Sequence, residues 1–71
     1  MDDLVLTTVN IYSDLFDRIK QIASDEGSTP TDIINRALAL ESFYVDVVKS
    51  GGKIIEEDRE GKMFVITRKK G

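Results

Sequence analysis

The sequence predicts a small, mostly α-helical fold with one strand at its N-terminus and a β-hairpin at its C-terminus. Three observations carry this prediction. Apolar and polar side chains alternate from Thr7 to Tyr12 and then recur with a helical period. A threonine, a proline and an aspartate begin a second helical run at residues 29–32. Two β-prone runs separated by a turn sequence follow a glycine pair.

The N-terminal strand is expected at residues 7–12, where the alternation gives the strand two distinct faces. One face is Thr7, Val9 and Ile11, and the other is Thr8, Asn10 and Tyr12. A lone strand leaves its backbone N–H and C=O groups unpaired, so this element requires a neighbouring strand.

The first helix is expected to follow the strand directly and to end at Gly27. Ser13 is a suitable N-cap, and Asp14 places a negative charge in the first turn, where the helix dipole favours it. Gly27 can adopt the left-handed conformation that ends many helices. The apolar stripe of this helix is Leu15, Ile19, Ile22 and Ala23.

The second helix is expected to run from Pro30 to about Lys49. Thr29 can cap it, Pro30 occupies the first position, where its missing N–H costs nothing, and Asp32 can reach back as in a capping box. The glycine pair at residues 51–52 ends it. Apolar residues cover more than one side of this helix, which therefore needs more than one neighbour. They are Ile33, Ile34, Ala37, Leu38, Leu40, Phe43, Tyr44, Val45, Val47 and Val48.

The C-terminal segment predicts a β-hairpin with strands at residues 53–57 and 62–67 and a turn at the sequence DREG. A two-stranded hairpin is barely stable alone, so we expect it to pack on the helices or to add to another edge. The expected organisation is a domain of residues 1–50, followed by the hairpin and a basic tail at residues 51–71.

The length and composition bound the protein class. A domain of 71 residues is marginally stable alone and, with no cysteine, has no disulfides, so oligomerisation is the expected support. The chain has no histidine or cysteine, and its carboxylates are expected in solvent-facing helix and turn positions and not in buried pairs, which argues against an enzyme. We expect no cofactor and no metal site. No apolar run approaches the roughly 20 residues that span a bilayer, and the N-terminus is acidic, unlike a signal peptide. A cytoplasmic location without membrane contact is therefore expected.

Charge is distributed unevenly along the chain. The net charge is −3, but residues 1–50 hold nine acidic against four basic side chains, and residues 51–71 hold six basic against four acidic ones. An acidic body argues against indiscriminate binding to nucleic acid, which depends on neutralising phosphates. It leaves room for a compact, specific site.

One strand followed by two helices, the second too apolar for a single neighbour, describes half of a larger unit. A second copy can supply the missing partner. We therefore expect a homodimer in which the two N-terminal strands pair antiparallel about a two-fold axis, while the second helices close a shared core.

The run TTVNIYSDLFDRIKQIASDEGSTPTDIINRAL resembles the ribbon-helix-helix repressors of the MetJ/Arc/CopG type. The resemblance covers residues 5–45 and leaves the hairpin outside. It rests on Val9, Ile11, Leu15, Ile19, Ile22, Gly27, Thr29, Ile33, Ile34, Ala37 and Leu38. It implies an intertwined homodimer with an intersubunit antiparallel ribbon. The dimer core would then include Val9, Ile11, Ile34 and Leu38.

The resemblance also implies a function, that of a transcriptional regulator, a repressor or an antitoxin, which lays its ribbon in the major groove of double-stranded DNA. The base-reading positions would be Leu6, Thr8 and Asn10. A phosphate would be held at the N-terminus of the second helix. The residues there are Ser28, Thr29 and Thr31.

Simpler interpretations stay open beside these roles. Thr8 and Asn10 can form an exposed polar strand face, Leu6 can pack against a partner, and capping alone accounts for residues 29–31. The alternative function is a protein-interaction module, in which the same dimer binds another protein through its acidic surface or the edge strand at residues 63–67. This alternative is favoured by Asp2 and Asp3, which place negative charge beside an uncharged ribbon.

Overall fold

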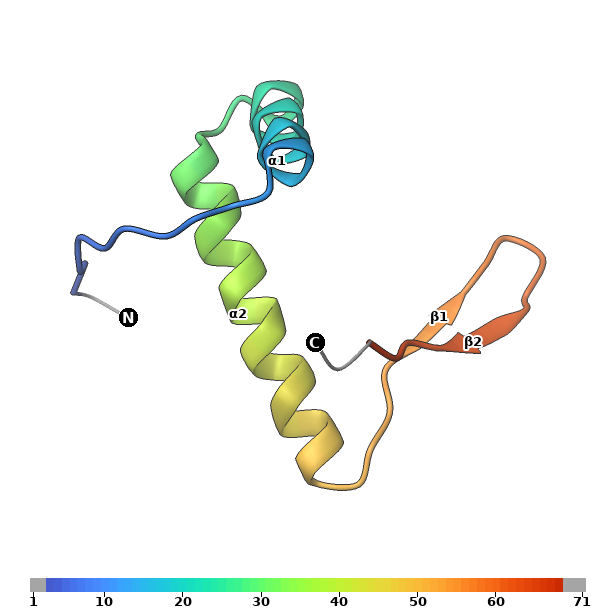
Figure 1. The fold of residues 1–71 in the computed structure, drawn as a ribbon. Coiled ribbons are helices and arrows are strands. Elements are labelled where there is room, and N and C mark those ends of the chain that lie inside the picture. The colour runs from blue at the N-terminus through green and yellow to red at the C-terminus, as the bar shows by residue number, and fades with distance from the viewer. Residues whose placement is uncertain (1–2, 69–71) are drawn as a thin grey trace. The chain divides into compact units, whose positions relative to one another are not determined.

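The computed structural model describes residues 3–68 (Figure 1). The described elements are two helices, α1 (Ser13–Glu26) and α2 (Pro30–Lys49), followed by two strands, β1 (Ile55–Glu57) and β2 (Met63–Val65). The protein is a small mixed fold with a two-stranded antiparallel sheet. It divides into two units whose boundary lies between Ile34 and Asn35, inside α2.

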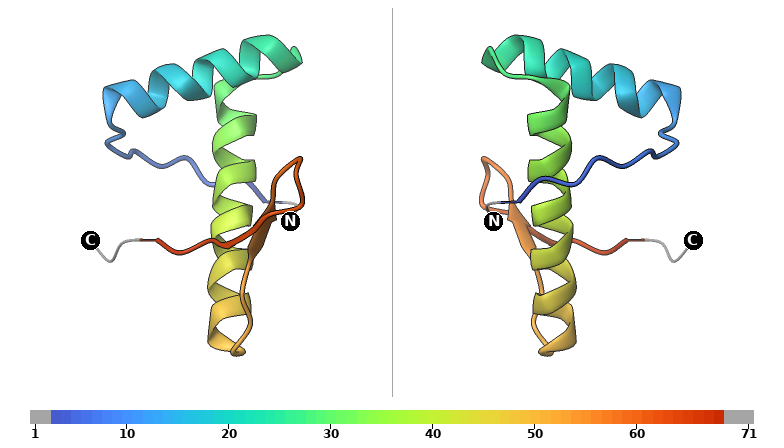
Figure 2. Two further views of the ribbon diagram at one scale, coloured as in Figure 1. Left: turned by 90° about the vertical axis from the view of Figure 1, so that its right-hand side faces the viewer. Right: turned by 90° about the vertical axis from the view of Figure 1, so that its left-hand side faces the viewer.

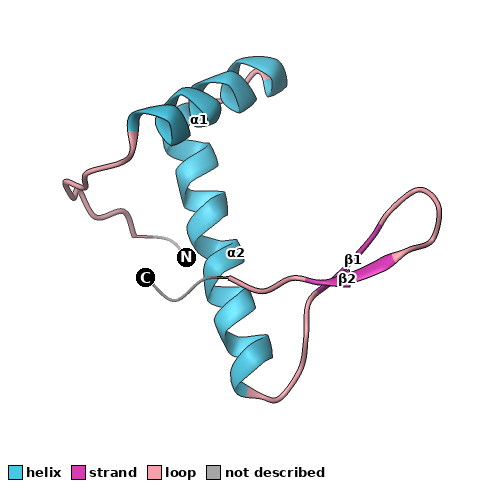
Figure 3. Cartoon of the chain, turned by 45° about the vertical axis from the view of Figure 1, so that its right-hand side comes forward, coloured by secondary structure: helices cyan, strands magenta, loops and turns pink. Residues whose placement is uncertain are grey.

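The N-terminal segment differs from the prediction, because residues 7–12 form no strand and the whole described segment before α1 is drawn as loop (Figure 3). The side chains of residues 3–10 are all exposed. A strand exists only through its ladder of hydrogen bonds, and the described part of a single chain supplies no segment that pairs with residues 7–12. The alternating pattern of residues 7–12 therefore produces no strand within one copy.

Helix α1 begins at Ser13, so the N-cap is Tyr12 and not the predicted serine. Tyr12 makes no side-chain capping bond, but its backbone carbonyl accepts the N–H of Phe16 at 2.9 Å. Asp14 lies in the first turn as predicted, and its carboxylate accepts the N–H of Leu15 at 2.9 Å. The negative charge there complements the helix dipole.

A turn built by Gly27 ends α1, as the sequence predicts. Gly27 has φ 66° and ψ 33°, which is the left-handed conformation. The N–H of Ser28 donates to the carbonyl of Ala23 at 2.8 Å, and the N–H of Gly27 donates to that of Ser24 at 3.3 Å. These two bonds define a Schellman motif, which satisfies carbonyls at the end of the helix.

Helix α2 begins at the predicted cap. The Oγ1 atom of Thr29 accepts the N–H of Asp32 at 3.1 Å. The carboxylate of Asp32 reaches back and accepts the hydroxyl of Ser28 at 2.7 Å. Figure 2 shows the resulting short turn between α1 and α2 from two sides.

The end of α2 repeats the Schellman geometry at the predicted glycine pair. The N–H of Gly51 donates to the carbonyl of Val48 at 3.0 Å, and the N–H of Gly52 donates to the carbonyl of Val47 at 2.9 Å. The hydroxyl of Ser50 also donates to the Val47 carbonyl, at 2.9 Å. Three donors thus cover the last turn of α2, and the chain turns away toward the hairpin.

The C-terminal hairpin is confirmed, with shorter strands than predicted. Its register places Ile55 opposite Val65, Glu56 opposite Phe64 and Glu57 opposite Met63. One further backbone bond, from Ile66 to the carbonyl of Ile54 at 2.8 Å, extends the ladder beyond the strands.

The tip of the hairpin is organised by Asp58 and Gly61. The Oδ1 atom of Asp58 accepts the N–H groups of Glu60 and Lys62 at 2.9 and 3.0 Å. Gly61 has φ 85°, and its N–H donates to the carbonyl of Asp58 at 3.1 Å. A three-residue loop that ends in a left-handed glycine is a common hairpin connection.

Few side chains are buried. Among the described residues the buried apolar side chains are Ala23 and Ile33, at 2% and 6% exposure, on either side of the turn between the helices. Both belong to the first unit, so the described residues of the second unit, 35–68, include no buried apolar side chain. The exposed large apolar side chains are Leu4, Val5, Leu6, Val9, Tyr12, Leu15, Leu38, Leu40, Phe43, Val48, Ile55, Met63, Phe64, Val65 and Ile66.

The Thr29 cap can be tested by substitution. Thr29→Ala removes the acceptor of the Asp32 N–H, and we expect the free energy of unfolding to fall by about 1 kcal/mol. Thr29→Ser keeps the hydroxyl and should retain most of the stability. Urea denaturation of both variants and the natural chain, at one protein concentration, measures the difference. Equal losses in both variants would contradict a capping role for the hydroxyl.

Candidate nucleic-acid interface

The predicted base-reading residues lie on the segment that precedes α1. Leu6, Thr8 and Asn10 are all exposed, and Leu6 has 101% of the accessible surface of a free side chain. The segment enters α1 without an intervening turn, because Tyr12 is already the N-cap. The three side chains are therefore available to a ligand, but one chain alone does not hold them on a common face.

The predicted dimer core is not assembled within one chain. Val9 and Leu38 are each 62% exposed, and Ile11 and Ile34 are half-buried. All four residues are apolar, and their exposure removes the free-energy gain that burial would give.

The polar side chains of the predicted phosphate site at the start of α2 already have partners within the chain. Thr29 accepts the Asp32 N–H, Ser28 donates its hydroxyl to the Asp32 carboxylate, and Thr31 also has a partner. A phosphate at this turn would meet the Asp32 carboxylate, which repels it. Ser28 can bind a phosphate only by exchanging its bond to Asp32, so the capping interpretation accounts for the observed geometry.

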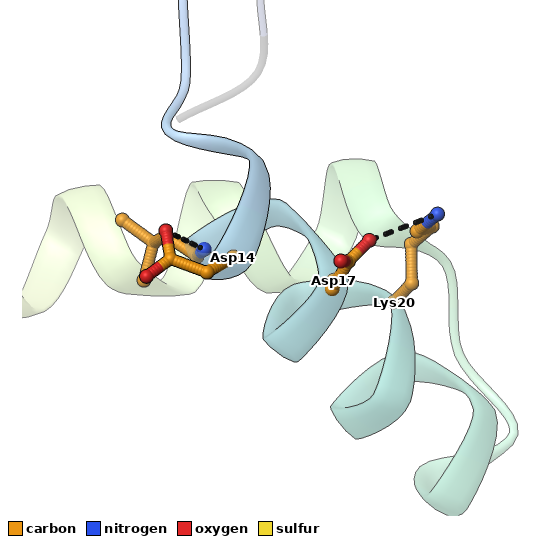
Figure 4. Close-up of polar contacts among 4 residues, drawn as sticks. Asp14, Asp17 and Lys20 are labelled. Atoms are coloured by element: carbon orange, nitrogen blue, oxygen red, sulfur yellow. Dashed lines mark hydrogen bonds and ion pairs between the residues drawn. The ribbon is translucent and has the colours of Figure 1, made fainter.

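The exposed face of α1 is acidic, and its lysine is paired within the helix. Lys20 lies 3.4 Å from the Asp17 carboxylate and 5.3 Å from the centre of the Phe16 ring. Figure 4 shows this ion pair beside the first-turn contact of Asp14. Asp25 accepts the side-chain amide of Gln21 at 2.9 Å. A lysine held by a neighbouring carboxylate contributes little positive potential toward a phosphate.

In the second unit, Arg68 is directed at α2. Its guanidinium pairs with the Glu41 carboxylate and lies 4.7 Å from the centre of the Tyr44 ring. Together with Ile66 these residues border a shallow apolar groove on α2, which also includes Ala37 and Leu40. Asp2 and the rest of the basic tail, after Arg68, lie outside the described residues.

Sequence reasoning missed this arrangement of Arg68. The sequence places Arg68 in the basic tail, and no local spacing links it to Tyr44, which lies 24 positions earlier. One signal was present: Tyr44 and Glu41 are three residues apart on one helix, which suits a planar cation.

Residues 3–68 contain no group of three or more histidine, cysteine, aspartate or glutamate residues that could hold a metal ion. No helix among them combines the length and the apolarity that crossing a membrane requires. Comparisons with protein-family models, curated proteins and solved structures find no match for the chain.

Proposed function

We propose that the protein is a homodimeric, sequence-specific DNA-binding regulator of the ribbon-helix-helix type, with the repressor or antitoxin role that such dimers serve. The observation that carries the proposal is the segment before α1. It alternates in polarity, exposes its side chains through residue 10, and finds no ladder partner within the described part of one chain. A segment with these properties suits an intersubunit ribbon.

Exposed apolar side chains support a dimer. Val9 and Leu38 are each 62% exposed. Burial of these side chains in an interface between two copies would stabilise the assembly.

In the proposed ribbon, the odd-numbered residues lie on one face and the even-numbered residues on the other. Val9 and Ile11 then face the helices, and Thr8 and Asn10 face the groove with Leu6. Asparagine can form two hydrogen bonds with the edge of adenine, and threonine can offer its hydroxyl or its methyl group to a base. The major groove is wide enough for a two-stranded ribbon.

The acidic surface of α1 restricts how such a dimer approaches DNA. Helix α1 carries four acidic and two basic side chains, so its net negative charge opposes close contact with the phosphates. The ribbon itself carries no charge at residues 4–12. Recognition would therefore depend on base contacts more than on phosphate neutralisation.

Dimerisation predicts that stability depends on protein concentration. A tenfold increase in concentration should add about 1.4 kcal/mol to the apparent stability, because the folded state is a dimer and the unfolded state a monomer. Thermal unfolding followed by circular dichroism over a hundredfold range of concentration measures this shift. A midpoint that stays constant over the whole range would contradict an obligate dimer.

Base reading predicts an effect of the ribbon side chains on DNA selection. The intact protein should enrich a short inverted repeat from a random duplex pool, and a Thr8→Ala/Asn10→Ala variant should not. Asn10→Ala alone should weaken binding by about 1–3 kcal/mol for each base that the amide recognises. Binding of the intact protein should weaken as salt rises.

A matched control is Gln21→Ala/Ser24→Ala, which removes two exposed polar side chains from α1 and should leave the selected repeat unchanged. If the intact protein enriches no sequence even at low salt, the DNA-binding proposal fails. The alternative, a protein-interaction module, would then be favoured by the exposed acidic face of α1.

A further inference from the structure

The edge of β2 that faces away from β1 has backbone groups without a hydrogen-bond partner among residues 3–68, and they follow a defined pattern. Backbone bonds join Ile66 to Ile54 and Asp58 to Lys62 across the hairpin. Because bonded and non-bonded pairs alternate in an antiparallel ladder, the N–H and C=O groups of Met63 and Val65 point away from β1. These two residues offer four backbone groups to another strand.

The two edges of the sheet differ in charge. The β2 edge from Met63 to Thr67 carries no charged side chain, and its four apolar side chains are 39–66% exposed. The β1 edge carries Glu56 and Glu57, and two more acidic side chains follow at the tip. Charged residues are a common protection against edge-to-edge pairing, and here they protect only β1.

We propose that β2 pairs antiparallel with β2 of a second copy of the chain, forming a four-stranded sheet in the order β1-β2-β2-β1. Met63 of each copy would exchange backbone hydrogen bonds with Val65 of the other. The two Phe64 residues would then lie directly opposite each other on the two-fold axis. This surface goes beyond the proposed DNA contact, because residues 63–65 lie outside the ribbon.

The second copy fits this edge because the pairing is self-complementary. The symmetric register satisfies all four outward groups of Met63 and Val65 and brings no like charges together, while Phe64 gains an aromatic cross-strand partner. The same arrangement at β1 would place Glu56 opposite Glu56, which is destabilising.

The four-stranded sheet also leaves no uncharged edge. After β2 has paired with β2, both outer edges are β1, and their glutamates oppose a further strand. Pairing of β2 with β1 of another copy would instead leave a free β2 edge and continue without closure. The symmetric sheet thus removes both uncharged edges in one contact.

Single cysteines test the contact, because the natural chain has none. In the proposed register the Phe64 positions form a non-hydrogen-bonded pair with Cα atoms about 4.5 Å apart, which a disulfide can bridge. The Glu56 positions lie on the outer strands, about 14 Å apart across three strand spacings. Phe64→Cys should therefore form a covalent dimer under mild oxidation without DNA, and Glu56→Cys should not.

A proline placed in the outer edge of β2 provides a second test of the contact. Val65→Pro removes an N–H that points away from β1, so the hairpin can survive while pairing with another copy is blocked. Added to Phe64→Cys, it should abolish the cross-link, and the matched Glu57→Pro on β1 should preserve it. Equal cross-linking by the two cysteine variants, or a cross-link that survives Val65→Pro, would overturn the proposal.

Hydrogen exchange at the N–H groups of Ile66 and Asp58 reports whether each variant keeps its hairpin. Absence of a cross-link in a Phe64→Cys chain that keeps the hairpin would also overturn the proposal. If this variant loses the hairpin, sedimentation of the Val65→Pro and Glu57→Pro chains replaces it. Val65→Pro should then weaken self-association about tenfold or more and Glu57→Pro should not, and equal constants would overturn the proposal. None of these readouts involves DNA, so they stand apart from the outcome of the duplex selection.

Discussion

The rest of this structure depends on one constraint: a single chain cannot cover its own apolar surface. Ala23 and Ile33 are its buried apolar side chains among the described residues, and fifteen large apolar side chains remain exposed. Conformational entropy opposes folding at every ordered residue, and so little burial cannot offset it. A partner chain would supply further burial, and the proposals made above for the ribbon and for β2 are two ways in which a second copy would do so.

The elements that were predictable from sequence are those whose causes are local. The Thr29 cap, the left-handed Gly27 and the end of α2 at residues 51–52 each depend on groups within about five positions, so the sequence alone indicates them. The hairpin is predictable for the same reason, through the turn that ends at Gly61. Its strands are shorter than expected, because strand ends depend on ladder bonds and not on β-propensity.

The parts that sequence did not determine are those with distant causes. A strand at residues 7–12 would need a pairing partner, and the described part of the chain supplies none, so the alternating pattern alone does not produce a strand. Ser13 fits a cap by composition, yet the helix starts one residue earlier than a Ser13 cap requires. The candidate site is affected most: Thr8 and Asn10 are exposed as expected, but the hydroxyl of Ser28 is bonded to Asp32 and Arg68 lies against Tyr44.

The Schellman turns at Gly27 and Gly51 have a consequence for the order of folding. Each closes through bonds between residues no more than five positions apart, so a newly made chain can shape its helix ends before it meets another copy. Local closure of this kind takes microseconds or less, whereas subunit assembly takes milliseconds to minutes and depends on concentration. If the active form is the proposed dimer, encounter between chains, and not helix formation, would therefore set the rate at which active protein accumulates after synthesis.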